Sequence, residues 1–234
     1  MNILPQAPML RLMERIRRVI TNQARLRQPE MNPRRWSNTE LRKLCCLFEG
    51  DVVNVSGFMD EDKEDGHYKD YFSKAHSYTI TNYAGSGEVG DGAEGSIYFD
   101  LEAEPPPELE GKFDVVFNHT VLEHIELIQP AFKNLAHLSK EVLITVVPFL
   151  QNEHYRPNIY GDYWRYTPLG LKALYEQHGF TMIYLNANDT PWYPVYLTAV
   201  GVRHPEKFTD FPSSPWTENA RIAKETYVYP NCAW

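Results

Sequence analysis

Cysteines and long apolar runs are scarce in this sequence. Its 234 residues include three cysteines, and two of them, Cys45 and Cys46, are adjacent, which provides neither a disulfide framework nor the spacing of a zinc site. No apolar run approaches the roughly 20 residues that a membrane-spanning helix needs, and the first residues lack the apolar core of a signal peptide. We therefore expect a cytoplasmic protein without a transmembrane segment and, at this length, most simply one globular domain.

Charge is distributed unevenly along the chain. The formal net charge is -8, but residues 1–43 contain ten Arg and Lys and three Glu, whereas residues 44–234 contain 13 basic and 28 acidic residues. An acidic body argues against a nucleic-acid substrate, because contacts with phosphates supply most non-specific affinity for nucleic acids. The basic N-terminal segment is suited to an acidic protein surface, a membrane surface, a second copy in a homo-oligomer or the acidic body itself.

The first 49 residues are predicted to be helical. Apolar residues recur at helical spacing in residues 8–27 beside an Arg-rich face, and the prolines that follow, Pro33 among them, are expected to end this helix. Residues 37–40 form a capping-box pattern that predicts the start of a second helix, which Gly50 would end. We therefore expect a helical N-terminal arm at 1–49, an α/β domain at 50–204 and a wrapping tail at 205–234.

From residue 50 onward, strand and helix patterns alternate. Strand patterns occur near residues 51–56, 78–83, 96–100, 113–117, 142–147, 180–185 and 195–203, and helical patterns near 130–139 and 168–178. Thr167 and Pro168 form a good N-cap and first-turn pair, and Gly179 a good helix stop. Alternating strands and helices predict an α/β fold with a doubly wound, mostly parallel sheet and helices on both faces.

Polar residues follow two of the predicted strands. Asn118 and His119 come after the strand that ends at Phe117, and residues 151–154 come after the strand that ends at Val147. Ligands of open α/β sheets bind beyond the carboxyl ends of the strands, so these residues are expected to face one crevice. The pattern indicates a binding site and favours an enzyme.

Three segments of the chain resemble one family, the class I S-adenosylmethionine (SAM)-dependent methyltransferases. Residues 113–125 (FDVVFNHTVLEHI) resemble the family's fourth strand and following turn, and residues 138–149 (LSKEVLITVVPF) resemble its fifth strand. Residues 161–180 (GDYWRYTPLGLKALYEQHGF) resemble the helix and strand after it. The subgroup that the chain resembles, methyltransferase type 11-like, acts on small molecules and often occurs among genes for bacterial surface-polysaccharide synthesis. The resemblance implies SAM as cofactor and strand order 3-2-1-4-5-7-6, with the seventh strand antiparallel.

The resemblance also implies which residues contact the cofactor. The family's glycine-rich turn matches residues 54–60, where Gly57 remains and the other glycine positions are occupied by Ser56, Phe58 and Asp60. An asparagine stands where the family has an acidic residue for the ribose hydroxyls, and an aspartate matches the acidic residue near the adenine. The implied cofactor-binding residues are Ser56, Gly57, Asn82, Asp100, Leu101 and Asn118.

Two further motifs point to other ligands. Residues 85–90 read G-x-G-x-x-G, the dinucleotide-binding pattern, but a new strand follows before a helix can begin, so we interpret them as a loop. His119, Glu123 and His124 are spaced H-x-x-x-E-H, one residue longer than the inverted zinc-protease motif. We therefore predict no metal site, and expect Glu123 and His124 to organise the turn and cap backbone groups.

The densest group of polar and aromatic residues lies at 152–166. Methyl transfer requires a bound sulfonium, which aromatic faces favour, a nucleophile in line with it, and often a base. The imidazole of His154 is suited to act as that base near neutral pH. His119 is the second candidate, expected to lie deeper and to orient groups, and Arg165 is suited to hold an acidic group of the acceptor.

These observations predict SAM-dependent methylation of a small polar acceptor, a sugar or sugar-phosphate hydroxyl or a glycan. The alternative is a methyltransferase-like binding or scaffold protein that has lost turnover. The altered glycine-rich turn favours the scaffold, and the polar residues on the acceptor side favour the enzyme. Fold analogy alone does not decide between them.

Overall fold

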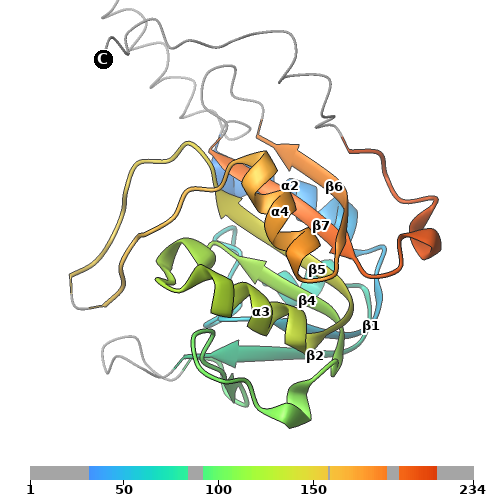
Figure 1. Cartoon of the computed structure of the whole chain (residues 1–234), viewed down its shortest axis with the longest axis horizontal. Helices are drawn as coiled ribbons and strands as arrows, with labels where there is room; N and C mark the ends of the chain where they lie inside the picture. The colour runs from blue at the N-terminus through green and yellow to red at the C-terminus, as the bar shows by residue number, and fades with distance from the viewer. Residues whose placement is uncertain (1–31, 84–91, 158, 189–194, 215–234) are drawn as a thin grey trace, which may run out of the picture.

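The computed structural model of the protein describes residues 32–83, 92–157, 159–188 and 195–214 (Figure 1). The helix predicted at 8–27, the G-x-G-x-x-G motif and the part of the tail after residue 214 lie outside the described residues. Among the helices that are described, none has the length and apolar character needed to cross a membrane.

A seven-stranded sheet forms the centre of the protein. Its order is β3-β2-β1-β4-β5-β7-β6, with β7 antiparallel to both of its neighbours and the other pairs parallel. The strands are β1 (Glu49–Asn54), β2 (Lys74–Asn82), β3 (Ile97–Tyr98), β4 (Phe113–His119), β5 (Ser139–Pro148), β6 (Thr181–Ala187) and β7 (Tyr196–Val202). The predicted fold class and strand order are confirmed.

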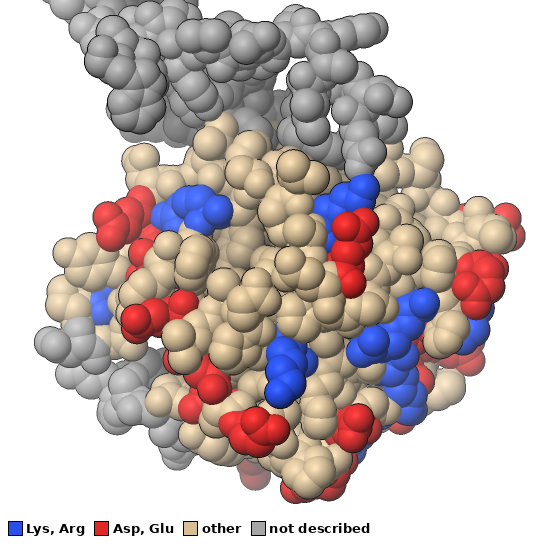
Figure 2. All heavy atoms as spheres, in the orientation of Figure 1, with Lys and Arg blue, Asp and Glu red and all other residues tan. Residues whose placement is uncertain are grey.

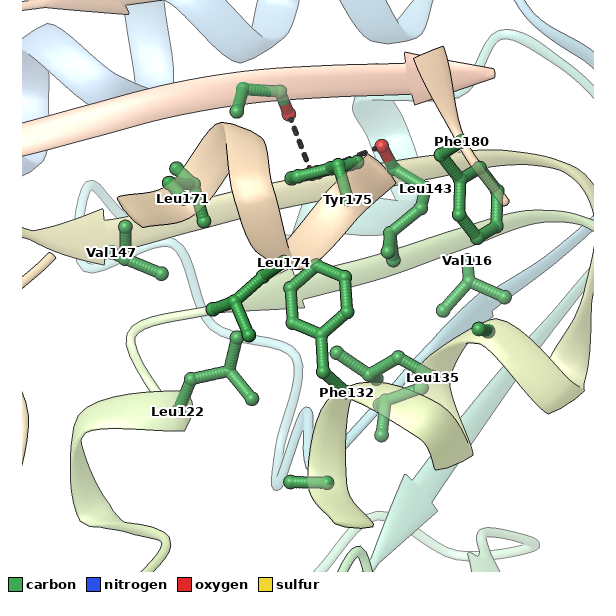
Figure 3. Packing of buried hydrophobic residues seen from close by; sticks show 14 of the residues in the cluster. Val116, Leu122, Phe132, Leu135, Leu143, Val147, Leu171, Leu174, Tyr175 and Phe180 are labelled. Carbon is green, nitrogen blue, oxygen red and sulfur yellow. Dashed lines mark hydrogen bonds between the residues drawn. The ribbon is translucent and has the colours of Figure 1, made fainter. Parts of the chain in front are cut away.

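Helices cover both faces of this sheet. α3 (Ile128–Leu138) and α4 (Pro168–Gln177) pack on one face, and α2 (Pro33–Cys45) packs on the other. Successive residues of a strand point to opposite faces, so in β4 Val116 joins the apolar cluster beneath α3 and α4, while Phe117 joins the cluster beneath α2. Figure 3 shows side chains of α3 and α4 meeting those of the central strands. Each such side chain stabilises the fold by about 1.5–3 kcal/mol on burial.

Charged side chains are interspersed on the face that α3 and α4 cover. In Figure 2 the basic groups of the described residues lie beside acidic ones over much of this face. Neutralising neighbours of this kind limit the electrostatic field that the face presents to solvent. Arg34, on α2, lines a cavity that is described below.

α2 begins earlier than its capping-box pattern predicts. Asn32 is the N-cap, and its side chain accepts a hydrogen bond from the backbone N–H of Arg34 over 2.9 Å. Pro33 therefore starts this helix rather than ending the preceding one, since proline is well suited to the first helical turn. An N-cap asparagine contributes about 1 kcal/mol to helix stability. The earlier start places Arg34 in the first turn, at the edge of the sheet where the strands end.

Gly50 lies inside β1 and not at the end of a helix, which corrects the prediction; α2 ends at Cys45. Its φ angle of 112° is one that glycine adopts readily, and the carboxylate of Asp114 occupies the space that a Cβ would need. That carboxylate accepts a hydrogen bond from the N–H of Asp51 over 2.8 Å. The glycine therefore lets β4 anchor the start of β1.

Candidate active site

A cavity of about 400 Å³ opens at the carboxyl ends of β1 and β4. These strands are neighbours in the sheet, and the strand order reverses between them, which is where open α/β sheets bind ligands. The turns after β1 and β4, the start of α2 and the β5–α4 loop (residues 149–167) enclose it. It is lined by Arg34, Gly57, Phe58, Met59, Glu61, Lys63, Thr120, Glu123, His124, His154, Tyr160 and Tyr196.

The turn after β1 follows a backbone path that glycines would favour, although it has one glycine. Ser56, Phe58 and Asp60 have φ angles of 58°, 50° and 62°, a region that costs a non-glycine residue roughly 1–2 kcal/mol. These are the three positions at which the family resemblance implied glycine. At Gly57 itself, a Cβ would collide with the side chain of Asn54.

Side chains from β1 and β2 hold this turn in place. The amide of Asn82 binds both backbone groups of Phe58, accepting from its N–H over 2.7 Å and donating to its carbonyl over 3.2 Å. The carboxylate of Asp60 is buried and accepts hydrogen bonds from Asn54 and Tyr78, each over 2.7 Å. Asn82 thus supports the turn, and a contact with a ribose would have to use the remaining hydrogen of its amide.

β4 continues two residues beyond its predicted end. Asn118 and His119 pair with Thr145 and Val146 of β5, so they are strand residues and not turn residues. The amide nitrogen of Asn118 donates to the carbonyl of Val55 over 3.0 Å, while its oxygen is buried without a hydrogen-bond partner among the described residues. Such an atom costs about 1–3 kcal/mol unless a ligand or water satisfies it.

His119 faces α2 and is held in its neutral form. A guanidinium nitrogen of Arg34 lies 2.7 Å from Nδ1, and the hydroxyl of Ser37 lies 3.1 Å from Nε2. Because a guanidinium only donates, Nδ1 is the acceptor and Nε2–H donates to Ser37. Burial, aided by the charge of Arg34, lowers the pKa of His119 well below 6.5. His119 does not line the cavity, and its contacts suit it to orient Arg34.

Arg34 brings a positive charge to the cavity. It donates to the hydroxyls of Tyr68 and Thr120 over 3.0 and 3.2 Å and lies over the ring of Tyr196. No carboxylate of the described residues forms an ion pair with it. A half-buried guanidinium without a counter-ion attracts anionic ligands. Sequence reasoning missed Arg34 because it is one of ten basic residues before residue 44.

All the hydrogen bonds of the Arg165 side chain are made within the β5–α4 loop. It forms a bidentate ion pair with Asp162, with both N···O distances 2.6 Å. Its remaining donors bind the backbone carbonyls of Gln151, Asn152 and Trp164. Five donors are all that a guanidinium has, so this arrangement leaves none for the acidic acceptor group predicted for Arg165. The pairing lowers the pKa of Asp162 to about 2.

Glu123 lies on the turn after β4 with an unpaired carboxylate. Its side chain is fully buried, and neither carboxylate oxygen has a hydrogen-bond partner among the described residues. Burial therefore raises the pKa of Glu123 to about 8. The expectation that this carboxylate caps backbone groups is wrong, although its backbone carbonyl accepts from the N–H of Tyr163 over 2.7 Å.

Two histidines adjoin this carboxylate. His124 donates from Nδ1 to the carbonyl of Gly161 over 2.6 Å, so it does organise the loop as predicted, and its Nε2 lies 3.9 Å from Glu123. The ring of His154 meets that of His124 edge-on, with centroids 4.9 Å apart. Nδ1 of His154 lies 3.4 Å from a carboxylate oxygen of Asp162.

Asp100 and Leu101 follow β3. Asp100 accepts a hydrogen bond from the N–H of Glu102 over 2.8 Å, and Leu101 is buried in the cluster beneath α3 and α4. Two exposed tyrosine rings, Tyr83 and Tyr98, lie beside each other where β2 and β3 end, with centroids 6.1 Å apart. The six predicted cofactor-binding residues thus lie at, or directly after, the carboxyl ends of β1, β2, β3 and β4. Of the three predicted catalytic residues, the structure brings His154 to the cavity and places the other two outside its lining.

No protein-family model and no curated protein sequence matches the chain. Solved structures do match it. An S-adenosylmethionine-dependent methyltransferase from Mesorhizobium loti is 10% identical, with a TM-score of 0.52 over 74% of this chain and 100% of that one. The methyltransferase in a complex with the Haloferax volcanii Trm112 methyltransferase activator is 13% identical, with a TM-score of 0.51 over 71% and 88%. The trans-methyltransferase CalH, in complex with SAH, is 14% identical, with a TM-score of 0.50 over 76% and 60%. These similarities establish the fold as that of SAM-dependent methyltransferases.

Proposed function

We propose that the protein is a class I SAM-dependent methyltransferase that binds its cofactor along the carboxyl ends of β1 to β4. The observation that carries this proposal is the cavity between the turns after β1 and β4, in a sheet whose order is that of the methyltransferase fold. The volume of about 400 Å³ is in the range of small-ligand sites.

Several features of the chain fit SAM. The left-handed turn at 56–60 keeps the path of a glycine-rich turn, so Ser56 and Gly57 would lie against the cofactor. The unpaired oxygen of Asn118 offers an acceptor to a bound donor. Asp100 and Leu101 would flank the adenine, and Asn82 would support the ribose side through the turn that it holds. When bound, SAM supplies an activated methyl group on a sulfonium.

The acceptor side favours a polar, acidic small molecule such as a sugar phosphate or uronate. Arg34 has a guanidinium without a carboxylate partner among the described residues, so it takes the role first predicted for Arg165. Exposed aromatic rings lie on the β5–α4 loop, at Tyr155, Tyr163 and Trp164. Aromatic side chains are common in ligand sites, and flat rings suit the faces of sugar rings.

In this proposal the chain's own residues position the acceptor and take its proton. Arg34 would hold the acidic group, and His154 would accept the hydroxyl proton, with Asp162 beside its other ring nitrogen. The arrangement of a base near the acceptor typically contributes about 10²–10⁴ in rate. His119, which is buried and neutral, would orient Arg34 and take no part in the proton transfer.

A binding or scaffold protein without turnover is the second candidate. The observation in its favour is that Phe58 and Met59 line the cavity, on the turn where glycines would leave room. Side chains at such positions compete for space with a closely approaching ligand.

Calorimetric titration of the full chain with SAM and with SAH separates these two candidates. We expect one binding site for each, and NAD serves as the control ligand that should not bind. Asp100→Ala should weaken SAM binding by about 10- to 150-fold, because a hydrogen bond to a charged group contributes about 1.5–3 kcal/mol. Glu104→Gln, at an exposed carboxylate after the same strand, is the matched control. Absence of binding at millimolar SAM and SAH would contradict the enzyme and favour the scaffold.

A further inference from the structure

Three potential metal ligands meet in the lining of the cavity. One ligand atom from each of Glu123, His124 and His154 lies within 4.8 Å of the other two, and all three residues line the cavity. They come from the turn after β4 and from the β5–α4 loop, which are 30 residues apart in sequence. Of the H-x-x-x-E-H residues, Glu123 and His124 belong to this cluster and His119 does not. The third potential ligand, His154, comes from a loop that is distant in sequence.

The carboxylate of Glu123 is the observation that points to a ligand. It is fully buried, both oxygens lack hydrogen-bond partners among the described residues, and it belongs to the cavity wall. Buried carboxylates in proteins are normally paired or bound to metals. The neighbouring guanidinium of Arg165 is already saturated by Asp162 and three carbonyls. Among the described residues, no Lys or Arg forms an ion pair with Glu123, whose nearest basic group is the imidazole of His124 at 3.9 Å.

Both histidines have the outer contacts that metal ligands have. A ligating histidine commonly gives its other ring N–H to a carbonyl or carboxylate, which fixes the tautomer. His124 donates from Nδ1 to the carbonyl of Gly161 over 2.6 Å, which leaves Nε2 free on the side of Glu123. His154 has Nδ1 at 3.4 Å from the carboxylate of Asp162, so its Nε2 is the ligand atom left to share an ion.

We propose that Glu123, His124 and His154 bind a divalent transition-metal ion of the zinc class. Two imidazoles and one carboxylate form a ligand set that suits zinc and keeps coordination positions open. Ligand atoms at about 2.0–2.2 Å from one ion lie closer together than these do, so His154, which is exposed on its loop, moves inward on binding. Magnesium and calcium prefer all-oxygen sites and are not the ions expected here.

The role of the ion rests on the proposed methyltransferase function. An acceptor hydroxyl that binds the ion has a lowered pKa and releases its proton to solvent. The S–CH₃ bond of SAM then breaks as the O–CH₃ bond forms, and SAH leaves. In this state His154 is a ligand and not the base, so the two roles of His154 are exclusive, and metal dependence distinguishes them.

The test uses the full chain, freed of metal with a chelator and dialysed. Titration with Zn²⁺ should show one equivalent bound, and Co²⁺ should give visible absorption bands of a low-coordinate site. Glu123→Gln, His124→Ala and His154→Ala should each weaken Zn²⁺ binding by more than about tenfold, a loss at least as large as that seen on removing a group that hydrogen-bonds to a metal ligand. Glu126→Gln and His76→Ala, at exposed residues outside the cluster, should bind as the unmodified chain does.

A thermal melt of each variant shows whether it is folded before it is titrated. No stoichiometric Zn²⁺ or Co²⁺ binding by the unmodified chain, or equal binding by folded Glu123→Gln, would overturn the proposal. SAM titrated into the same samples keeps the two proposals separate. Zn²⁺ binding without SAM binding would contradict only the methyltransferase, and SAM binding without Zn²⁺ binding would contradict only the metal site.

Discussion

A guanidinium nitrogen of Arg34 lies 2.7 Å from Nδ1 of His119, joining the first turn of α2 to the last residue of β4 across 85 positions of sequence. Because the donor is a permanent cation, this contact fixes both the charge state of the imidazole and the direction in which the guanidinium points. It therefore couples a buried histidine to the electrostatics of the cavity.

Stability should fall in acid because of His119. Its pKa is depressed in the folded state by burial and by Arg34, and Tyr68 and Tyr196 are the other titratable groups that face it. Below about pH 6.5 the unfolded chain binds a proton that the folded chain does not, so stability is lost as pH falls, by up to about 1.4 kcal/mol per pH unit. Glu123, whose pKa is raised to about 8, contributes a change of opposite sign in the same range, so the informative quantity is a difference. In thermal melts from pH 8 to pH 5, His119→Asn, which keeps an acceptor for Arg34, should gain stability relative to the unmodified chain as pH falls. Equal slopes for the two proteins would contradict this account.

Arg34 should determine the preference for acidic acceptors. Arg34→Gln removes the cation and should weaken an acceptor bearing a phosphate or carboxylate by about 10- to 150-fold, since charge-assisted hydrogen bonds contribute about 1.5–3 kcal/mol. A neutral analogue should be affected little, so the ratio of kcat/KM for the two acceptors is the measurement. Arg35→Gln is the matched control, because Arg35 is exposed and pairs with Glu64. An unchanged ratio in Arg34→Gln would show that the acidic group binds elsewhere.

Arg165→Lys should loosen the β5–α4 loop. A lysine cannot replace two parallel bonds to Asp162 and three bonds to carbonyls, and a buried oxygen atom that loses its donor costs about 1–3 kcal/mol. Limited proteolysis should cut the loop faster in this variant, with SAM affinity retained. Glu153→Gln, at an exposed residue of the same loop, controls for a change of charge. Proteolysis at the original rate would show that the loop does not depend on this pairing.

In the turn after β1, two neighbouring substitutions should change the stability of the protein in opposite directions. Ser56→Gly should stabilise the protein by up to about 1 kcal/mol. A residue with a Cβ pays roughly 1–2 kcal/mol for the left-handed conformation, which glycine avoids, but glycine loses more conformational freedom on folding. Gly57→Ala should destabilise it, since the new Cβ would meet Asn54. Chemical denaturation of both variants measures these differences. A stabilising Gly57→Ala would contradict the described course of the turn.

Much of the fold could be predicted because short sequence patterns, such as helix caps and apolar runs, determine where helices and strands form. The N-cap at Thr167 and the first-turn proline at 168 start α4 as predicted, since these signals act within one helical turn. The apolar run at 142–147 predicted β5, whose burial on both faces requires continuous apolar residues. Boundaries were less predictable: Pro33 starts α2, and β4 extends to His119 because pairing with β5 continues there.

Sequence by itself determined the alternation of strands and helices, and with it the edge of the sheet at which Asn118, Ser56 and Asp100 lie. Only the tertiary structure decided which ionisable groups have partners. Arg165 is saturated by neighbours within its own loop, whereas among the described residues Arg34 reaches the cavity without a counter-ion and Glu123 without a hydrogen-bond partner for its carboxylate. The physical reason is range: periodicity and capping act over a few residues, but whether a charge is paired or buried depends on contacts between segments far apart in the chain, which local patterns do not encode.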